Sequence, residues 1–255
     1  MAINEVFPNP TVKQVIFQIT FPNLFYIESK IGDLQIKIMD SFPESSLLLQ
    51  KQIVFAVGDD KKIENFKQEI PQEQGLKVWN FENNNLGYKL QVSFNSLSIT
   101  STFHKTYNNE NSEHKFRDII KKVLIAFSES TKLPIVNRIG LRYIDECPIK
   151  SKTTNSFRKY YNSCLNSKRF PIEETIEYQY VQVTSKGSNF IRYAEFYNAN
   201  KNKDILVLDF DGFSNNVKFE KLINICDQLH EIISSEYELT IKGPVYTYMR
   251  KEKNG

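Results

Sequence analysis

Apolar and polar residues alternate along several short stretches of the chain, a pattern that predicts β-strands with one buried face. In residues 12–22, every second position from Val15 to Phe21 is apolar. A stretch at 51–57 is apolar on both faces, which is typical of a central strand. Further strands are predicted at residues 76–82, 88–94, 96–103, 136–146, 174–183, 190–198 and 204–211.

Apolar residues that recur at intervals of three and four predict the helices. One helix is expected over residues 24–38, and it ends before Pro43. Two long amphipathic helices are expected over residues 112–130 and 217–237, and a short helix over 155–165. Because strands and helices occur in separate runs, the pattern indicates an α+β fold.

The order of these elements repeats along the chain. Residues 1–131 are expected to hold a strand, a helix, four strands and a long helix, and residues 132–255 a strand, a helix, three strands and a long helix. We interpret this as two similar halves that form one continuous unit, a curved antiparallel sheet with helices on one face. This order resembles the saddle of TATA-box-binding proteins and other helix-grip folds, and such a likeness does not transfer function. The uncovered face of such a sheet is either a binding surface or a homodimer interface.

Composition indicates a globular protein without a cofactor. Hydrophobic residues make up 40% and charged residues 25% of the 255 residues. No window approaches the roughly 18 apolar residues of a membrane helix, and the first residues do not form a secretory signal. The three cysteines and three histidines are scattered, so we expect no disulfide framework and a reducing, cytoplasmic location. The chain has no glycine-rich phosphate-binding motif, and neither a cofactor nor a bound metal is expected.

Two arginines flank a glycine in the strand predicted at 136–146. Arg138, Gly140 and Arg142 share one face of this strand, because side chains alternate between the two faces. The missing side chain at Gly140 would leave a notch between two guanidinium groups, which could grip a phosphate or a carboxylate of a partner. The alternative, which we favour, is structural: the arginines pair with Asp209 and Asp211 on a neighbouring strand.

Two weaker patterns concern catalysis. Asp209 and Asp211 could bind Mg²⁺ with Glu195 nearby, although no third ligand is identifiable. His104 or His114, which flank a polar turn, could act as the general base of a nuclease. His230 falls on the apolar side of its helix and is expected at the edge of the core. Neither pattern forms a complete constellation, so we assign no catalytic residue.

The strongest charge signal is the segment Lys150–Phe170. It contains six basic residues and no acidic residue, so it carries +6 in 21 residues, whereas the whole chain carries +3 and the remainder therefore −3. Aromatic residues are interleaved with the basic ones, a combination that suits single-stranded nucleic acid. The alternative is a solvated loop and helix whose aromatic rings pack inward. The candidate nucleic-acid-binding residues are Lys150, Lys152, Arg158, Lys159, Tyr160, Tyr161, Lys168 and Arg169.

Four stretches carry a family resemblance: the strand at 12–22, the motif Arg138–Tyr143 in mid-chain, the aspartate-containing strand at 205–211, and the closing helix with the triplet Leu229–Glu231. The chain resembles a sporadically distributed, uncharacterised bacterial family of similar length. The resemblance covers nearly the whole chain. It implies a bacterial cytoplasmic protein, is compatible with mobile or defence-linked genes, and supplies no catalytic residue.

Together these observations favour a non-enzymatic binding module. Its partner would be a protein, a second copy of the chain, or RNA or single-stranded DNA, in a bacterial defence or toxin–antitoxin context. The alternative function is a nuclease of a defence system that uses His104, His114 or the pair Asp209 and Asp211. No membrane association is expected.

Overall fold

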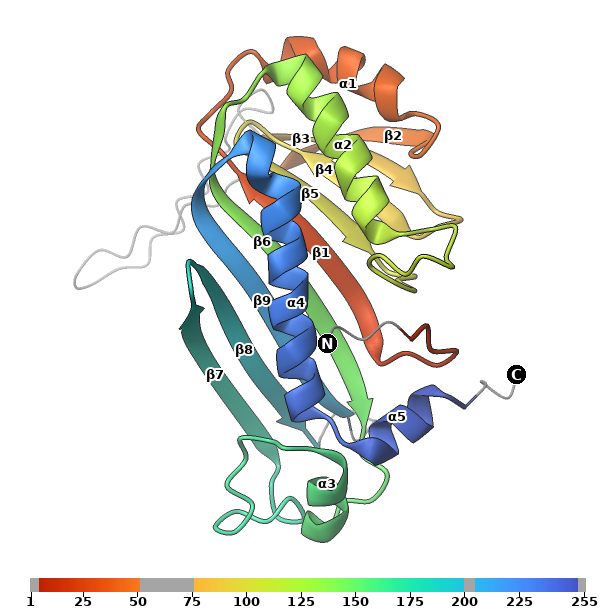
Figure 1. Cartoon of the computed structure of the whole chain (residues 1–255), viewed down its shortest axis with the longest axis vertical. Coiled ribbons are helices and arrows are strands. Elements are labelled where there is room, and N and C mark those ends of the chain that lie inside the picture. The colour runs from red at the N-terminus through yellow and green to blue at the C-terminus, as the bar shows by residue number, and fades with distance from the viewer. Residues whose placement is uncertain (1–4, 51–75, 200–204, 252–255) are drawn as a thin grey trace, which may run out of the picture.

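The computed structural model describes residues 5–50, 76–199 and 205–251. These ranges form an α+β structure around one curved antiparallel sheet in the order β2-β3-β4-β5-β1-β6-β9-β8-β7 (Figure 1). The strands are β1 (Val12–Thr20), β2 (Glu44–Gln50), β3 (Leu76–Asn83), β4 (Tyr88–Val92), β5 (Ser96–Ser101), β6 (Ile135–Pro148), β7 (Glu177–Lys186), β8 (Asn189–Asn198) and β9 (Ile205–Lys218). The helices are α1 (Ile31–Ile38), α2 (Phe116–Thr131), α3 (Thr154–Tyr160), α4 (Leu222–Thr240) and α5 (Gly243–Met249), with 3-10 turns η1 (Ile27–Lys30) and η3 (Phe219–Lys221).

The first strands of the two halves meet at the centre of the sheet. β1 and β6 pair antiparallel, with Phe17 opposite Leu141 and Thr20 opposite Arg138. On the outer side of this pair, β1 binds β5 and β6 binds β9, so each half pairs its own first strand with its own last strand. The remaining strands of each half continue outward as antiparallel hairpins.

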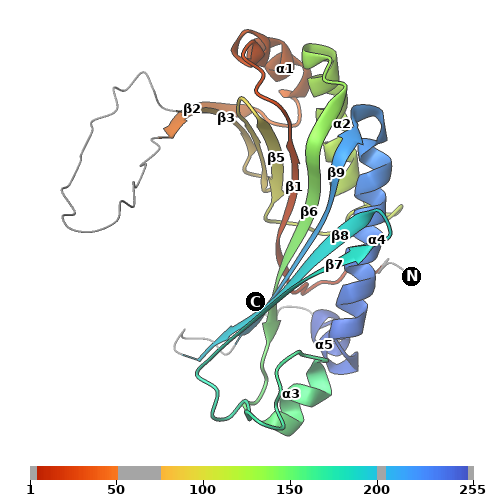
Figure 2. The same cartoon turned by 90° about the vertical axis from the view of Figure 1, so that its left-hand side faces the viewer.

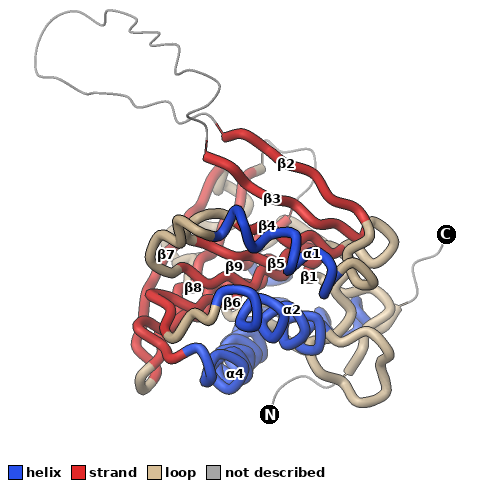
Figure 3. Tube along the Cα trace, turned by 90° about the horizontal axis from the view of Figure 1, so that it is seen from above, coloured by secondary structure: helices blue, strands red, loops and turns tan. Residues whose placement is uncertain are grey.

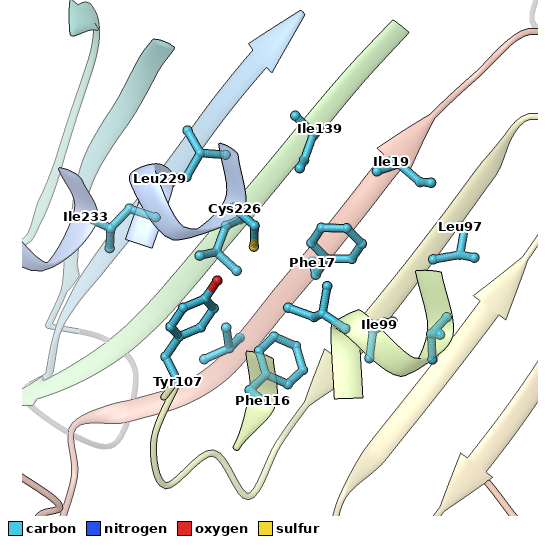
Figure 4. Close-up of a cluster of buried hydrophobic side chains, with 14 of the residues drawn as sticks. Phe17, Ile19, Leu97, Ile99, Tyr107, Phe116, Ile139, Cys226, Leu229 and Ile233 are labelled. Atoms are coloured by element: carbon cyan, nitrogen blue, oxygen red, sulfur yellow. The ribbon is translucent and has the colours of Figure 1, made fainter. Parts of the chain in front are cut away.

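The two long helices α2 and α4 lie together on one side of the sheet (Figures 2 and 3). Phe17 and Ile19 of β1 point toward them and are fully buried. Strands β5 and β6 add Ile99 and Ile139 to the same core, and Cys226 of α4 closes it from the helix side (Figure 4). Because alternate residues of each strand face this layer, the apolar positions of the periodic pattern become the core, and the polar positions fall on the uncovered face.

Most predicted elements are confirmed, and several differ in extent. The short helix expected at 155–165 ends at Tyr160, and the last long helix begins at Leu222 and not at 217. The helix expected at 24–38 starts at Ile27 as the turn η1 before α1. Strand β9 runs seven residues past the predicted end at Asp211, because the polar stretch after Asp211 stays paired with the equally long β6 as far as Lys218. The strand predicted at 51–57 lies outside the described residues. The preceding strand β2, which the sequence did not predict, is an edge strand whose Leu47 and Leu49 are half-exposed and therefore break the expected alternation.

Within the described ranges, no helix has both the length and the apolar character that a membrane crossing requires.

Candidate functional site

Three arginines and two aspartates form a hydrogen-bonded cluster on the uncovered face of β6, β9 and β8. Arg142 binds Asp209 through two contacts, from Nε at 2.7 Å and from Nη2 at 2.8 Å. Arg192 donates from Nη1 to the same carboxylate at 2.8 Å. Arg138 donates from Nη2 to both oxygens of Asp211, at 3.1 and 2.9 Å. We call these five residues the arginine–aspartate cluster.

The strand register explains why the cluster forms. Arg142 of β6, Asp211 of β9 and Arg192 of β8 stand directly opposite one another in a single row across three strands. Asp209 lies two residues from Asp211 and so shares its face. Opposite charges on adjacent strands lie within reach of direct and diagonal contacts. Asp209 is only 3% exposed, and its two arginine partners supply the compensation that a buried carboxylate needs.

The notch expected at Gly140 is occupied by the side chain of Arg138. A Cβ atom added to Gly140 would lie 2.6 Å from Nη1 of Arg138. The same guanidinium group lies over the ring of Phe213, 4.7 Å from its centroid. The predicted pairing of Arg138 and Arg142 with the aspartates is therefore confirmed. Binding of an external anion by Arg138, Gly140 and Arg142 stays a prediction, and it would require Arg138 to leave both Asp211 and Phe213.

The suggested metal site does not assemble around Asp209 and Asp211. Both carboxylates are bound by arginines. The prediction that Glu195 lies near these aspartates was wrong, because Glu195 stands opposite Leu208 and therefore points to the helix-covered face. There Glu195 is fully buried and accepts hydrogen bonds from the Ser163 hydroxyl and, at 2.9 Å, from the Cys164 amide. Across the described ranges, no three potential ligand side chains of the His, Cys, Asp or Glu type come together.

The basic segment Lys150–Phe170 forms α3 and the loops around it, at the lower end of the molecule in Figure 1. In the part of the chain that the structure describes, none of its six basic side chains forms an ion pair. Arg158 instead donates to the Ser167 hydroxyl at 2.8 Å, and Lys152 lies 5.7 Å from the ring centroid of Tyr197. A further cation comes from outside the segment, since the Lys242 ammonium donates to the backbone oxygen of Arg158. We call this region the basic end.

The aromatic residues of the basic end divide into two groups. Tyr161 is 2% exposed and donates its hydroxyl proton to the Pro148 oxygen at 2.6 Å, so it was wrongly chosen as a base-stacking residue. Tyr160 is half-buried beside it. Phe170 is 54% exposed, and the Arg169 guanidinium lies 5.0 Å from its ring centroid. Phe170 was absent from the predicted binding residues, although its position between Arg169 and Pro171, outside any apolar repeat, could have indicated an exposed ring.

The structure brings together two histidines that are far apart in the sequence. His104 packs edge-on against the rings of Phe116 and Tyr143, and His230 accepts or donates a 3.2 Å hydrogen bond with the Tyr143 hydroxyl. Burial lowers the pKa of His104 to about 3 and that of His230 to about 4, so both rings are neutral near pH 7. His114, the other histidine considered for catalysis, is exposed and lies before α2.

The two surface regions differ in how their charges are compensated. In the arginine–aspartate cluster every arginine has a carboxylate partner. At the basic end, Glu173 follows the cations in sequence but binds the amide and hydroxyl of Thr154.

Comparison with known proteins finds no matching family model, no matching curated protein and no matching solved structure.

Proposed function

We propose that the protein is a non-enzymatic binding module that holds single-stranded nucleic acid, RNA or DNA, at the basic end. One observation carries the proposal: six clustered cations have no carboxylate partner among the described residues. Like charges gathered in one region repel each other, and their combined field attracts a partner of opposite charge. A polyanion that binds there supplies the missing negative charge and releases its own counterions.

The exposed ring of Phe170 adds a second element of recognition. A base can stack on an exposed aromatic ring, a contact that contributes about 1–3 kcal/mol and accepts every base. The Arg169 guanidinium packs against this ring, and both side chains remain exposed at the surface. The arginine–aspartate cluster is a poorer phosphate site, because its guanidinium groups already bind Asp209 and Asp211.

The test is a titration of fluorescently labelled single-stranded RNA and DNA by fluorescence anisotropy over a range of salt concentrations. The test variant carries Lys159→Glu, Lys168→Glu and Arg169→Glu, three exposed residues of the basic end. The matched control carries the same charge change at three exposed lysines of α2, of the end of β9 and of the turn η3, toward the opposite end of the molecule (Figure 1). These control substitutions are Lys121→Glu, Lys218→Glu and Lys221→Glu.

We expect the test variant to bind at least tenfold more weakly at low salt and the control to lose much less. The slope of log Kd against log salt should fall by about 2 in the test variant, since each phosphate contact on a single strand contributes about 0.7. Equal losses in both variants would show that net charge alone drives binding and would refute the assignment to the basic end. If no strand binds even at low salt, nucleic-acid binding is refuted. The remaining candidates are then a protein partner or a second copy of the chain, bound at the uncovered face.

The same mixtures, incubated with and without Mg²⁺, test the alternative of a nuclease. Cleavage that disappears in His114→Ala or Asp209→Asn would overturn the binding-module proposal. A cytoplasmic setting and a role in bacterial defence or a toxin–antitoxin system complete the proposal. The setting is supported by the scattered cysteines and the family resemblance, and the role by the resemblance.

A further inference from the structure

A cavity of about 110 Å³ lies on the helix-covered side of the sheet, away from the arginine–aspartate cluster. Its walls come from the segment before β1 and the start of β1, the loop after β5, strands β6 and β9, and helices α4 and α5. An apolar protein cavity of about 150 Å³ is large enough to hold benzene. The space here therefore suits a ligand of about five heavy atoms.

The polar floor of the cavity is a buried carboxylate. Asp145 is 4% exposed, and its Oδ1 accepts a 2.8 Å hydrogen bond from the Thr11 hydroxyl. The Thr11 oxygen in turn lies 2.6 Å from the Tyr237 hydroxyl, which can donate to it. In the described part of the chain, no lysine, arginine or histidine forms an ion pair with Asp145. When it is ionised, this carboxylate is stabilised by the Thr11 hydroxyl and by the more remote charge of Lys13.

The side walls of the cavity are mostly aromatic. Tyr107 stacks on His230 with ring centroids 4.1 Å apart, and Tyr143 lies between His230 and His104. Phe210 adds a fully buried ring. The two imidazoles are neutral near pH 7, so they do not supply the charge that Asp145 lacks. Aromatic faces attract cations through their quadrupole, and this attraction strengthens where water is excluded.

We propose that this cavity binds a primary alkylammonium ion whose charge meets Asp145 and whose alkyl body fills the aromatic and apolar walls. An anion would face the Asp145 carboxylate, and Lys105 is the only lysine or arginine among the described lining residues that could compensate it. A neutral molecule of the same shape would leave that carboxylate unpaired. The inference is independent of the proposed nucleic-acid binding, because it uses none of the residues of the basic end.

The wild-type protein is titrated by NMR with three probes of nearly equal shape: butylammonium, 1-butanol and butyrate. A ligand of five heavy atoms is expected to bind with a Kd of about 1 mM. Butylammonium should bind at least tenfold more tightly than 1-butanol, and butyrate should not bind. The shifted signals should include the imidazole protons of His104 and His230. Equal affinity for butylammonium and 1-butanol, or no binding of butylammonium, would overturn the proposal without any variant.

Two variants on the same strand complete the test. Asp145→Asn keeps the shape of the side chain and an oxygen acceptor for Thr11 but removes the charge, so butylammonium should bind at least tenfold more weakly. Glu146→Gln removes a charge from the next residue, which is exposed, and should leave the affinity unchanged. Loss of binding in both variants, or in neither, would refute the role of Asp145. A final titration uses lysine whose α-amino and carboxyl groups are both blocked. If it also binds, the ligand can be a lysine side chain; if it does not, the cavity accepts only a free small amine.

Discussion

Replacing Gly140 with alanine would place a Cβ atom 2.6 Å from Nη1 of Arg138. The backbone on either side is held by pairing with β1 and β9, so it cannot move away from the contact. The flexible guanidinium group would move instead. It would then lose its hydrogen bonds to Asp211 and its place over the Phe213 ring. The substitution therefore tests whether Gly140 exists to seat Arg138.

The expected size of the effect follows from these contacts. The side chains of Arg138 and Asp211 are 28% and 20% exposed, so the ion pair contributes about 1 kcal/mol. The cation–π contact with Phe213 adds about 0.5–1 kcal/mol. Against this loss, alanine in a strand interior is more favourable than glycine by about 0.5–1 kcal/mol. We expect Gly140→Ala to lower the free energy of unfolding by about 1 kcal/mol, or the melting temperature by about 2–4 °C.

The decisive measurement is a double-mutant cycle by urea denaturation. In an Arg138→Ala background the obstructing guanidinium is absent, so Gly140→Ala should be neutral or should raise the free energy of unfolding by about 0.5–1 kcal/mol. The change of sign corresponds to a coupling of about 1–2 kcal/mol between the two positions. Equal destabilisation in both backgrounds would refute the reasoning, because the cost would then come from the backbone or from another neighbour.

Two further predictions concern buried carboxylates. Asp209→Asn should lower the free energy of unfolding, measured by urea denaturation, by about 2–3 kcal/mol. This is less than the full penalty for a broken buried pair, because Arg142 and Arg192 are 42% and 30% exposed. Asp211→Asn affects a single arginine and should cost about half as much, so equal costs would contradict the ranking. Burial raises the pKa of Asp145 from 3.8 to about 7. Between pH 3.8 and pH 7 the folded protein therefore keeps a proton on Asp145 that the unfolded chain has lost, and the free energy of unfolding falls as the pH rises through this window. Asp145→Asn should therefore gain stability relative to the wild type between pH 4 and 7, by about 2–4 kcal/mol at the upper end, and a pH-independent difference would contradict the assignment. His104 and His230 act in the opposite direction below pH 6.5 in both proteins and cancel in the comparison.

Local patterns predicted the elements whose burial follows a simple period. Phe17 and Ile19 alternate with polar residues, and the structure buries both completely. The edge strand β2 has no alternation of apolar and polar residues to predict it. Its Leu47 and Leu49 are half-exposed, and only backbone pairing with β3 defines the strand. The pairing of Arg142 with Asp209 could be anticipated, because the two arginines share one face of their strand, the two aspartates share one face of theirs, and buried charges need partners.

The cavity could not be predicted from the sequence. Asp145 lies in a strand with alternating apolar residues, and nothing in its neighbours shows that its partner would be the hydroxyl of Thr11, which is 134 positions away. His104 and His230 likewise meet only because β6, α4 and the loop after β5 converge. Contacts between residues so distant in the chain depend on topology, which a local period does not encode.

The central pairing of β1 with β6 has a consequence for synthesis on the ribosome. When the first 131 residues have emerged, β1 has its partner β5, but its other edge is unpaired until β6 is made. Lys13 is the only charged residue in β1, so the waiting edge has little protection against pairing with another chain. Pairing of β1 with β6 also closes a loop of more than a hundred residues, which slows folding. The nascent chain is thus most prone to aggregate in the interval between the synthesis of its two halves, when a chaperone would have its greatest effect.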